Sequence, residues 1–237
     1  MARPGPPASG AVDDVDNLAR RLDPDRWLAS RFVADRDTRA DVVALYAFDA
    51  ELARVGLVAS NPLTGEIRLA WWRDAIKDIF EDSLVQAHPA LRALAGAISR
   101  RGLPRLPLDR MIGARASVLT GIDASAAEQW ADACGASAAV LAARILDPSA
   151  AETPVALAGR AWGLLLLRRS SALPKDVIDP LLRKAFAAAA VSLPGLSPAA
   201  FPAVAYATLI RADLRSCSAS GLERRLRLVA AVARGRI

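Results

Sequence analysis

The chain has 237 residues, of which 53% are hydrophobic and only 5% are aromatic, and its formal net charge is +6. This length supports one substantial core, and the hydrophobic content excludes a disordered chain. Two cysteines and one histidine are too few for a disulfide framework, a histidine metal site or a catalytic triad. The basic residues are interleaved with Asp and Glu and no nucleic-acid motif is present, so we expect no nucleic-acid partner.

The ends of the chain and its apolar runs indicate where in the cell the protein is expected to be. Residues 1–12 are rich in Pro, Gly and Ala and predict a flexible tail, followed by a single helical domain over residues 13–237. The tail lacks the apolar stretch of a signal peptide, and no apolar run approaches the thickness of a bilayer. We therefore expect a cytoplasmic protein, with peripheral contact to the inner face of the cell membrane through its excess of arginine. A coding bias would explain the same excess without any function.

Helical periodicity recurs along the whole chain, and no segment has the alternation of a β-strand. Thr64 and Ser125 are expected to cap two of the helices, and Gly102 and Gly121 to end two others. The predicted fold is all-α, a single-domain bundle around a central core or cavity. The expected helices cover residues 13–22, 26–33, 39–55, 64–82, 88–101, 110–119, 125–146, 151–171, 177–191, 203–214 and 222–233.

The segment Arg39–Val55 is predicted to be the central helix, because it contains neither Gly nor Pro and its apolar residues recur at three- and four-residue spacings. Those apolar residues, which we expect to be buried, are Val42, Leu45, Tyr46, Phe48, Leu52 and Val55. Asp49 and Glu51 lie two residues apart, so they point to different faces and cannot chelate one ion together. We expect Glu51 or Asp49 to pair with Arg54 or with a neighbouring helix.

The words ALYAF at residues 44–48 and WWRDAI at residues 71–76 resemble the opening of the squalene/phytoene synthase family. The resemblance extends from about Asp25 to Ala190 and implies an isoprenoid-synthase-like helical bundle. Active members join two prenyl diphosphates head to head and hold magnesium with aspartates. At the first aspartate motif this chain has Ala53, Arg54 and Leu57, which offer no carboxylate to a hard dication.

The other motifs of the family are altered in the same way. Arg115 matches the family's arginine, but Val118 stands where an aspartate follows it. In the segment AGRAWGLLLLRRSSALP, residues 158–174, Leu166 replaces an asparagine, Arg169 is kept and Ser170 replaces an aspartate. The substitutions are expected to turn the inner helix faces at Ala53, Leu57, Val118 and Leu166 into apolar packing surfaces.

The word AFDAELARV, residues 47–55, resembles a divergent, non-catalytic branch of the same family, which includes the mitochondrial complex I assembly factor and bacterial relatives. This resemblance implies a binding or assembly factor for respiratory complex I with a protein partner, and implies no catalytic residue, metal or cofactor. The candidate cavity or altered-motif positions are Asp49, Ala53, Arg54, Leu57, Arg73, Arg115, Val118, Leu166, Arg169 and Ser170.

Several alternatives stay open from the sequence. The chain could be a prenyltransferase of the squalene/phytoene synthase type, or a protein that binds an apolar lipid or isoprenoid in a retained cavity. Arg73 and Arg115 fit either a cavity wall or a structural ion pair. Trp71 and Trp72 fit either the core or the wall of a pocket, with the core favoured.

Overall fold

The computed structural model describes residues 9–59, 61–83, 85–215 and 220–237, with side chains from residue 14 onward. Helices make up the fold, and the described residues contain no β-strand. Short 3-10 turns lie at 193–195, 201–203 and 205–209. The helices are α1 (Ser9–Leu22), α2 (Pro24–Ser30), α3 (Arg36–Val58), α4 (Pro62–Phe80), α5 (Pro89–Arg101), α6 (Arg105–Thr120), α7 (Ala124–Ala131), the π-helical turn η1 (Asp132–Ala136), α8 (Ser137–Leu146), α9 (Glu152–Arg169), α10 (Lys175–Ser192), α11 (Ile210–Leu214) and α12 (Gly221–Arg234).

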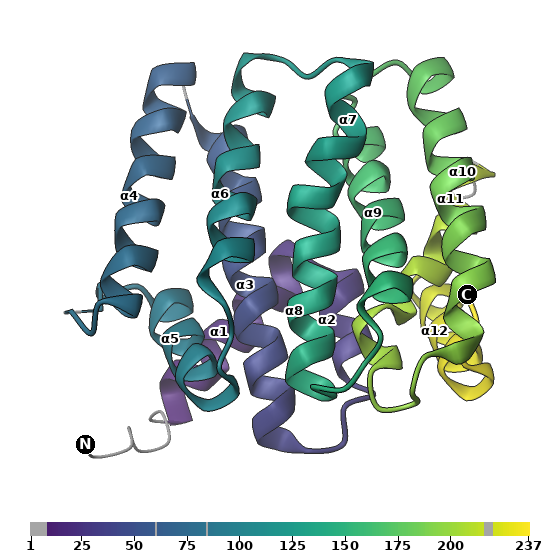
Figure 1. Cartoon of the computed structure of the whole chain (residues 1–237), viewed down its shortest axis with the longest axis horizontal. Helices are drawn as coiled ribbons and strands as arrows, with labels where there is room; N and C mark the ends of the chain where they lie inside the picture. Colours follow the sequence, from purple (N-terminus) through teal and green to yellow (C-terminus); the bar gives the residue numbers. More distant parts are fainter. Residues whose placement is uncertain (1–8, 60, 84, 216–219) are drawn as a thin grey trace.

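The long helices stand side by side as a single bundle (Figure 1). In this view α4, α6, α7 with α8, α9 and α10 run roughly upright, and α12 lies at the lower right. The predicted all-α, single-domain bundle is confirmed. In the described part of the chain, no helix is both long and apolar enough to cross a membrane.

The central helix is α3, because it packs against α1, α2, α4, α5, α6 and α8. Every residue from Asp41 to Ala50 is buried, and the six apolar residues that the periodicity assigned to the core are all buried. Asp35 caps the N-terminus of α3, where its carboxylate accepts a hydrogen bond from the Thr38 backbone N–H. A helix buried on most of its faces needs a partner for every charged residue it carries inward.

The helix predicted over residues 125–146 is interrupted by η1. Gly135 lies in this turn, and its missing side chain lets the backbone approach α9 closely at Gly159 and Gly163. A Cβ on Gly135 would lie 2.2 Å from the carbonyl oxygen of Gly159. The two helices therefore cross at backbone contact, which fixes α9 against the middle of the molecule.

Several expected boundaries differ from the structure. The N-caps are Asn61 rather than Thr64 and Asp123 rather than Ser125, since each carboxylate or amide oxygen accepts the backbone N–H three residues on. Residues 9–12 belong to α1 rather than to a tail, and the first eight residues of the expected tail lie outside the described residues. The helix expected over 203–214 is α11 preceded by 3-10 turns, in a stretch that begins with Pro202.

Candidate functional site

One face of α3 carries Asp49, Ala53 and Leu57, which follow one another at intervals of four residues. Asp49 is 1% exposed, Ala53 is exposed and Leu57 is 82% exposed. The expectation that Ala53 and Leu57 pack inward is therefore wrong. Beyond Leu52, only Val55 of this helix is still covered by its neighbours. The altered metal-motif positions thus lie at the open end of α3, and Asp49 lies one turn deeper.

Asp49 is held by two arginines from two other helices. Its Oδ2 accepts a hydrogen bond from Nη2 of Arg26 on α2 at 2.7 Å. Its Oδ1 accepts one from Nη2 of Arg115 on α6 at 2.6 Å. Arg26 also pairs with Asp23, so two carboxylates and two guanidinium groups balance in charge. The four residues form the central ion-pair cluster.

The central ion-pair cluster fixes the charge of Asp49. Burial opposes ionisation, but the charges and hydrogen bonds of Arg115 and Arg26 outweigh it and hold the pKa of Asp49 below its usual range. The guanidinium of Arg26 lies 5.0 Å from the ring centroid of Tyr46, and that of Arg115 lies 5.0 Å from the ring of Trp130. Both cations are thus enclosed by aromatic rings as well as by carboxylates. Each oxygen of the Asp49 carboxylate thus accepts a hydrogen bond from an arginine, and the residue is only 1% exposed.

A second ion-pair group lies at the C-terminal end of α9. Arg169 donates from Nη1 to Asp25 on α2 at 2.9 Å and from Nη2 to Asp213 on α11 at 2.8 Å. Asp25 also accepts a hydrogen bond from Nη1 of Arg224 on α12 at 2.5 Å. Arg168 pairs separately with Asp179 on α10, so the two neighbouring arginines point to different partners, as their helical angle predicts.

The remaining positions singled out by sequence do not converge on one site. Val118 and Leu166 are partly buried against the core, as expected for them. The hydroxyl of Ser170 donates to the carbonyl of Leu167 at 3.0 Å, and Arg73 is exposed without an ion-pair partner among the described residues. Arg115 is an ion-pair partner, which decides between the two interpretations left open for it. Arg54 pairs with Glu51 at the surface.

The residues at the family's metal positions do not fit magnesium. Ala53, Leu57, Val118 and Leu166 have no oxygen in their side chains, and Arg54 would repel a cation. Across the described residues, no group of three or more His, Cys, Asp and Glu side chains is placed to hold a metal ion. No reaction step that needs such an ion can be assigned to this part of the chain.

Sequence reasoning missed Asp23, Asp25 and Arg26. All three belong to the short segment that opens α2, and the sequence gives no periodic or motif signal for their roles. Arg26 is 23 residues from Asp49, and Arg169 is 144 residues from Asp25. Only the packing of α2 against α3 and beside the 3-10 turns that precede α11 brings these groups together.

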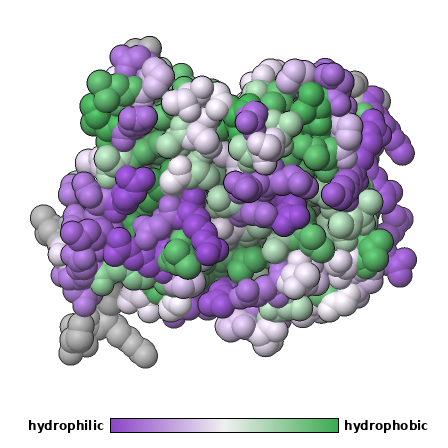
Figure 2. Space-filling view, turned by 45° about the horizontal axis from the view of Figure 1, so that its top comes forward, coloured by the Kyte–Doolittle hydropathy of each residue, from purple (hydrophilic) through white to green (hydrophobic). Residues whose placement is uncertain are grey.

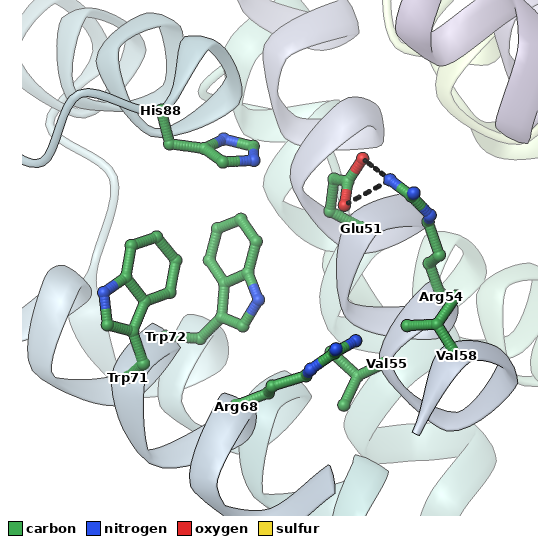
Figure 3. A pocket seen from close by; sticks show the side chains of 8 residues that line it. All are labelled: Glu51, Arg54, Val55, Val58, Arg68, Trp71, Trp72 and His88. Carbon is green, nitrogen blue, oxygen red and sulfur yellow. Dashed lines mark hydrogen bonds and ion pairs between the residues drawn. The ribbon is translucent and has the colours of Figure 1, made fainter. Parts of the chain in front are cut away.

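A pocket of about 250 Å³ lies between the C-terminal half of α3 and residues 68–72 of α4 (Figure 3). Its aromatic wall is formed by Trp71, Trp72 and His88, with the rings of Trp71 and Trp72 nearly perpendicular at 5.1 Å. Trp72 is buried against Phe48, whereas Trp71 is 40% exposed. Trp72 is thus a core residue, as expected, that also lines the pocket. Trp71 lines the pocket with a partly exposed ring.

The charges around the pocket do not cancel. Glu51 accepts a hydrogen bond from Nη1 of Arg54 at 3.2 Å, as the dashed lines in Figure 3 show. Arg68 also lines the pocket and has no acidic partner among the residues that the structure describes. Burial lowers the pKa of His88, so this imidazole is neutral at pH 7. The pocket thus combines aromatic walls with one excess positive charge.

A comparison with the sequence models of known protein families shows to which family this chain belongs. The sequence model described as squalene/phytoene synthase matches residues 19–176. The chain belongs to the squalene/phytoene synthase family. The match includes α2, α3, α4 and α6, and so contains the whole central ion-pair cluster.

A sequence comparison finds a human protein that is similar to part of this chain. The human protein NADH dehydrogenase (ubiquinone) complex I, assembly factor 6, is 30% identical over 114 residues, which are 48% of this chain and 34% of the human protein. The match therefore spans about a third of the human protein's length.

Two solved structures share the fold. A dehydrosqualene synthase crystallised in complex with a ligand superposes with a TM-score of 0.75 at 13% identity, covering 94% of this chain and 95% of that chain. Squalene synthase HpnC from Alicyclobacillus acidocaldarius gives a TM-score of 0.62 at 16% identity, covering 95% of this chain and 94% of that chain. The fold of these two synthases is thus kept over nearly the full length of this chain.

Proposed function

We propose that this member of the squalene/phytoene synthase family is a non-catalytic binding factor that takes part in the assembly of respiratory complex I. The observation that carries the proposal is Asp49, the acid closest to the altered metal motif on α3, held between Arg26 and Arg115. Ionising a prenyl diphosphate requires neutralisation of its leaving group, which in this family is the role of metal ions. In this chain, the Asp49 carboxylate is instead paired with Arg26 and Arg115, close to the position where an enzyme of the family would keep carboxylates free for metal ions.

The similarity to human complex I assembly factor 6 supports the choice of partner. The matching part of the human protein is about a third of its length, so the assembly role remains our proposal for this chain. A factor of this kind needs a surface that recognises another protein. Recognition surfaces commonly combine an exposed aromatic residue with apolar neighbours and a few charges.

The outer face of α4 has these properties. Leu63, Ile67 and Trp71 recur at four-residue intervals, and they are 66%, 62% and 40% exposed. Figure 2 shows a hydrophobic group at the upper left, on the side where α4 runs in Figure 1. Trp71 joins this strip to the pocket, and Arg68 adds a positive charge that has no acidic partner in the described part of the chain. We propose the strip and the pocket together as the contact surface for the protein partner.

Two alternatives make different predictions. A prenyltransferase would require metal ligands that the described residues do not offer at the family positions. An apolar lipid or isoprenoid carrier would require an open interior, but the middle of the bundle is filled by Tyr46, Phe48, Trp162 and Tyr206, all with less than 2% exposure. We therefore rank both below the assembly role. We further propose a cytoplasmic location with peripheral contact to the inner face of the cell membrane, on the basis of the net charge of +6.

The assembly role is tested by deleting the gene in its own organism and measuring complex I on native gels stained for NADH oxidation. We expect loss of the assembled complex and its recovery with the parent chain. Arg68→Glu should fail to restore assembly, whereas Arg73→Glu should restore it. Both arginines are exposed on α4 and unpaired among the described residues, but only Arg68 lines the pocket. Normal complex I in the deletion strain contradicts the proposal.

The enzymatic alternative is tested separately. The purified chain is incubated with farnesyl or geranylgeranyl diphosphate in magnesium or manganese buffer, and extracted lipids are compared with those of a boiled control. We expect no head-to-head product. Product that disappears on adding a chelator would establish the prenyltransferase alternative instead.

A further inference from the structure

The helix α12 has two apolar faces, of which the fold uses one. Leu228 and Ala231 are buried and face the 3-10 turn at 205–209, against which α12 packs. On the opposite side, Leu222, Leu226 and Val229 recur at spacings of four and three residues, and they are 67%, 59% and 51% exposed. These three residues form the outer strip of α12. The outer strip is not needed to hold the helix in place.

The charges beside the outer strip are predominantly positive. Residues 221–237 contain five arginines and one acid, Glu223. Glu223 is already paired with Arg227, and Arg224 is paired with Asp25. Arg225, Arg234 and Arg236 have no ion-pair partner among the described residues, and the first two are exposed on α12. The apolar strip is thus bordered by positive charge without nearby acid to neutralise it.

The neighbouring elements do not supply that acid. Asp25 on α2 is engaged by Arg169 and Arg224, and Asp213 on α11 is engaged by Arg169. The exposed guanidinium groups of Arg225 and Arg234 therefore have no acidic partner among the described residues. These positive charges, next to an outward apolar strip, complement a surface that is both anionic and apolar beneath its charges.

The contrast with α4 separates two kinds of partner. Helix α4 also exposes an apolar strip, but its nineteen residues carry three acids and three bases. That balance suits a protein surface, in which both signs of charge meet. The basic excess of α12 suits a lipid bilayer, because amphipathic helices rich in arginine lie in the interface with their apolar side chains among the acyl chains.

We propose that α12 is the element that binds an anionic membrane, with Leu222, Leu226 and Val229 inserted at the level of the headgroups and Arg225 and Arg234 bound to lipid phosphates. The inference rests on the membrane-facing part of the proposed function and names the helix and the lipid class that this part requires. Insertion to this depth leaves the α4 strip and the pocket free for the protein partner.

The test measures binding of the full chain to vesicles by cosedimentation, using phosphatidylcholine alone and phosphatidylcholine mixed with phosphatidylglycerol. We expect binding to the mixed vesicles only, weakening as the salt concentration rises above about 0.1 M because added ions screen the arginines. Arg225→Glu should reduce the partition coefficient about twenty-fivefold, since one arginine near such a surface is worth about fivefold and a charge reversal applies that factor twice. Leu226→Asp should reduce it to a similar extent.

The matched control is Ile67→Asp, which places the same charge on an equally exposed apolar position of α4. This variant should bind vesicles within about twofold of the parent, because α4 does not face the lipid in the proposed orientation. Circular dichroism of all three variants should match the parent, since the substituted positions are exposed. Leu226→Ala provides a milder change if the aspartate variant does not fold.

The outcomes separate this inference from the wider proposal. If the parent binds mixed vesicles but Arg225→Glu and Leu226→Asp bind equally well, α12 is not the binding element, while the membrane proposal stands. If the parent binds no vesicles, both the inference and the peripheral location are wrong, and the assembly role is still decided by the deletion strain. If vesicles do not bind and Leu226→Asp abolishes complex I assembly, the outer strip contacts a protein instead, which overturns the lipid inference.

Discussion

Asp49 and Arg115 are joined by a hydrogen bond of 2.6 Å in an interior where Asp49 is almost fully inaccessible to solvent. A single buried carboxylate thus holds α3 against α6, and through Arg26 it also holds α2. In a member of the squalene/phytoene synthase family, this contact lies one helical turn from the position of a metal-binding aspartate, now Ala53. The Asp49 carboxylate therefore links three helices of the bundle through its two arginine partners.

We predict that Asp49→Asn lowers the free energy of unfolding by about 3 kcal/mol or more, because Arg115 then stays buried without an opposite charge. Urea unfolding followed by circular dichroism measures this change. The control is Glu51→Gln, since the pair of Glu51 with Arg54 is partly exposed and should cost less than about 1 kcal/mol. Equal unfolding midpoints for Asp49→Asn and the parent would mean that water reaches the central ion-pair cluster.

The stability should also depend on pH through Asp49. Its pKa is lower in the folded chain than the value of about 3.9 expected in the unfolded chain, so its contribution is present above that pH. The contribution is lost as the pH falls through the lower pKa of the folded state. Urea unfolding between about pH 2 and pH 6 should therefore give a flatter profile for Asp49→Asn than for the parent. Parallel profiles would contradict the ionised state of Asp49.

Some pH dependence should survive in Asp49→Asn. Hydrogen bonds from the side chains of Thr38, Ser125 and Ser149 lower the pKa values of Asp35, Asp123 and Asp147, respectively. These carboxylates lie at helix or turn starts and act in the same direction as Asp49. The comparison therefore concerns the difference between the two profiles and not the slope of either one.

A third prediction concerns the close crossing of η1 and α9. Gly135→Ala should destabilise the chain by about 1 to 3 kcal/mol or more, because the new Cβ would meet backbone atoms of Gly159 and Gly163 that cannot move independently. Gly113→Ala on α6 is the matched control, since a Cβ there meets no atom within 4 Å. That control should be neutral or stabilising by up to about 1 kcal/mol, through its higher helix propensity. A thermal melt of both variants measures the difference in their stability. Similar midpoints would argue against the backbone contact.

Restoring the first acidic motif should not restore chemistry. The double substitution Ala53→Asp and Leu57→Asp should change the free energy of unfolding by less than about 1 kcal/mol, because both positions are exposed. We expect no product from farnesyl diphosphate and magnesium, since Val118, Leu166 and Ser170 offer no carboxylate at their positions on the opposite helices. Chelator-sensitive product from this variant, extracted and identified by mass spectrometry, would show that one acidic helix suffices.

The sequence by itself determined the helices and the family. Periodicity acts within one helix, and the caps and breakers act within a few residues, so α3, α5 and α9 could be placed to within a few residues without any knowledge of their neighbours. The absence of a carboxylate at Ala53, Val118 and Ser170 is also readable from the chain, whereas the aspartates expected at these positions are implied by the family resemblance.

Only the tertiary structure decided the environment of each side chain. Asp49 meets Arg26 and Arg115 across 23 and 66 residues, and no local pattern encodes which of the 31 basic residues will reach it. Leu57 was expected to face inward because of the family motif position that it occupies, but it is 82% exposed, because the last turn of α3 extends beyond the helices that cover it. The outer strip of α12 likewise emerged only once its other face was seen to be buried. Burial and charge pairing are set by which helices pack together, and that packing is a property of the whole chain rather than of any one segment.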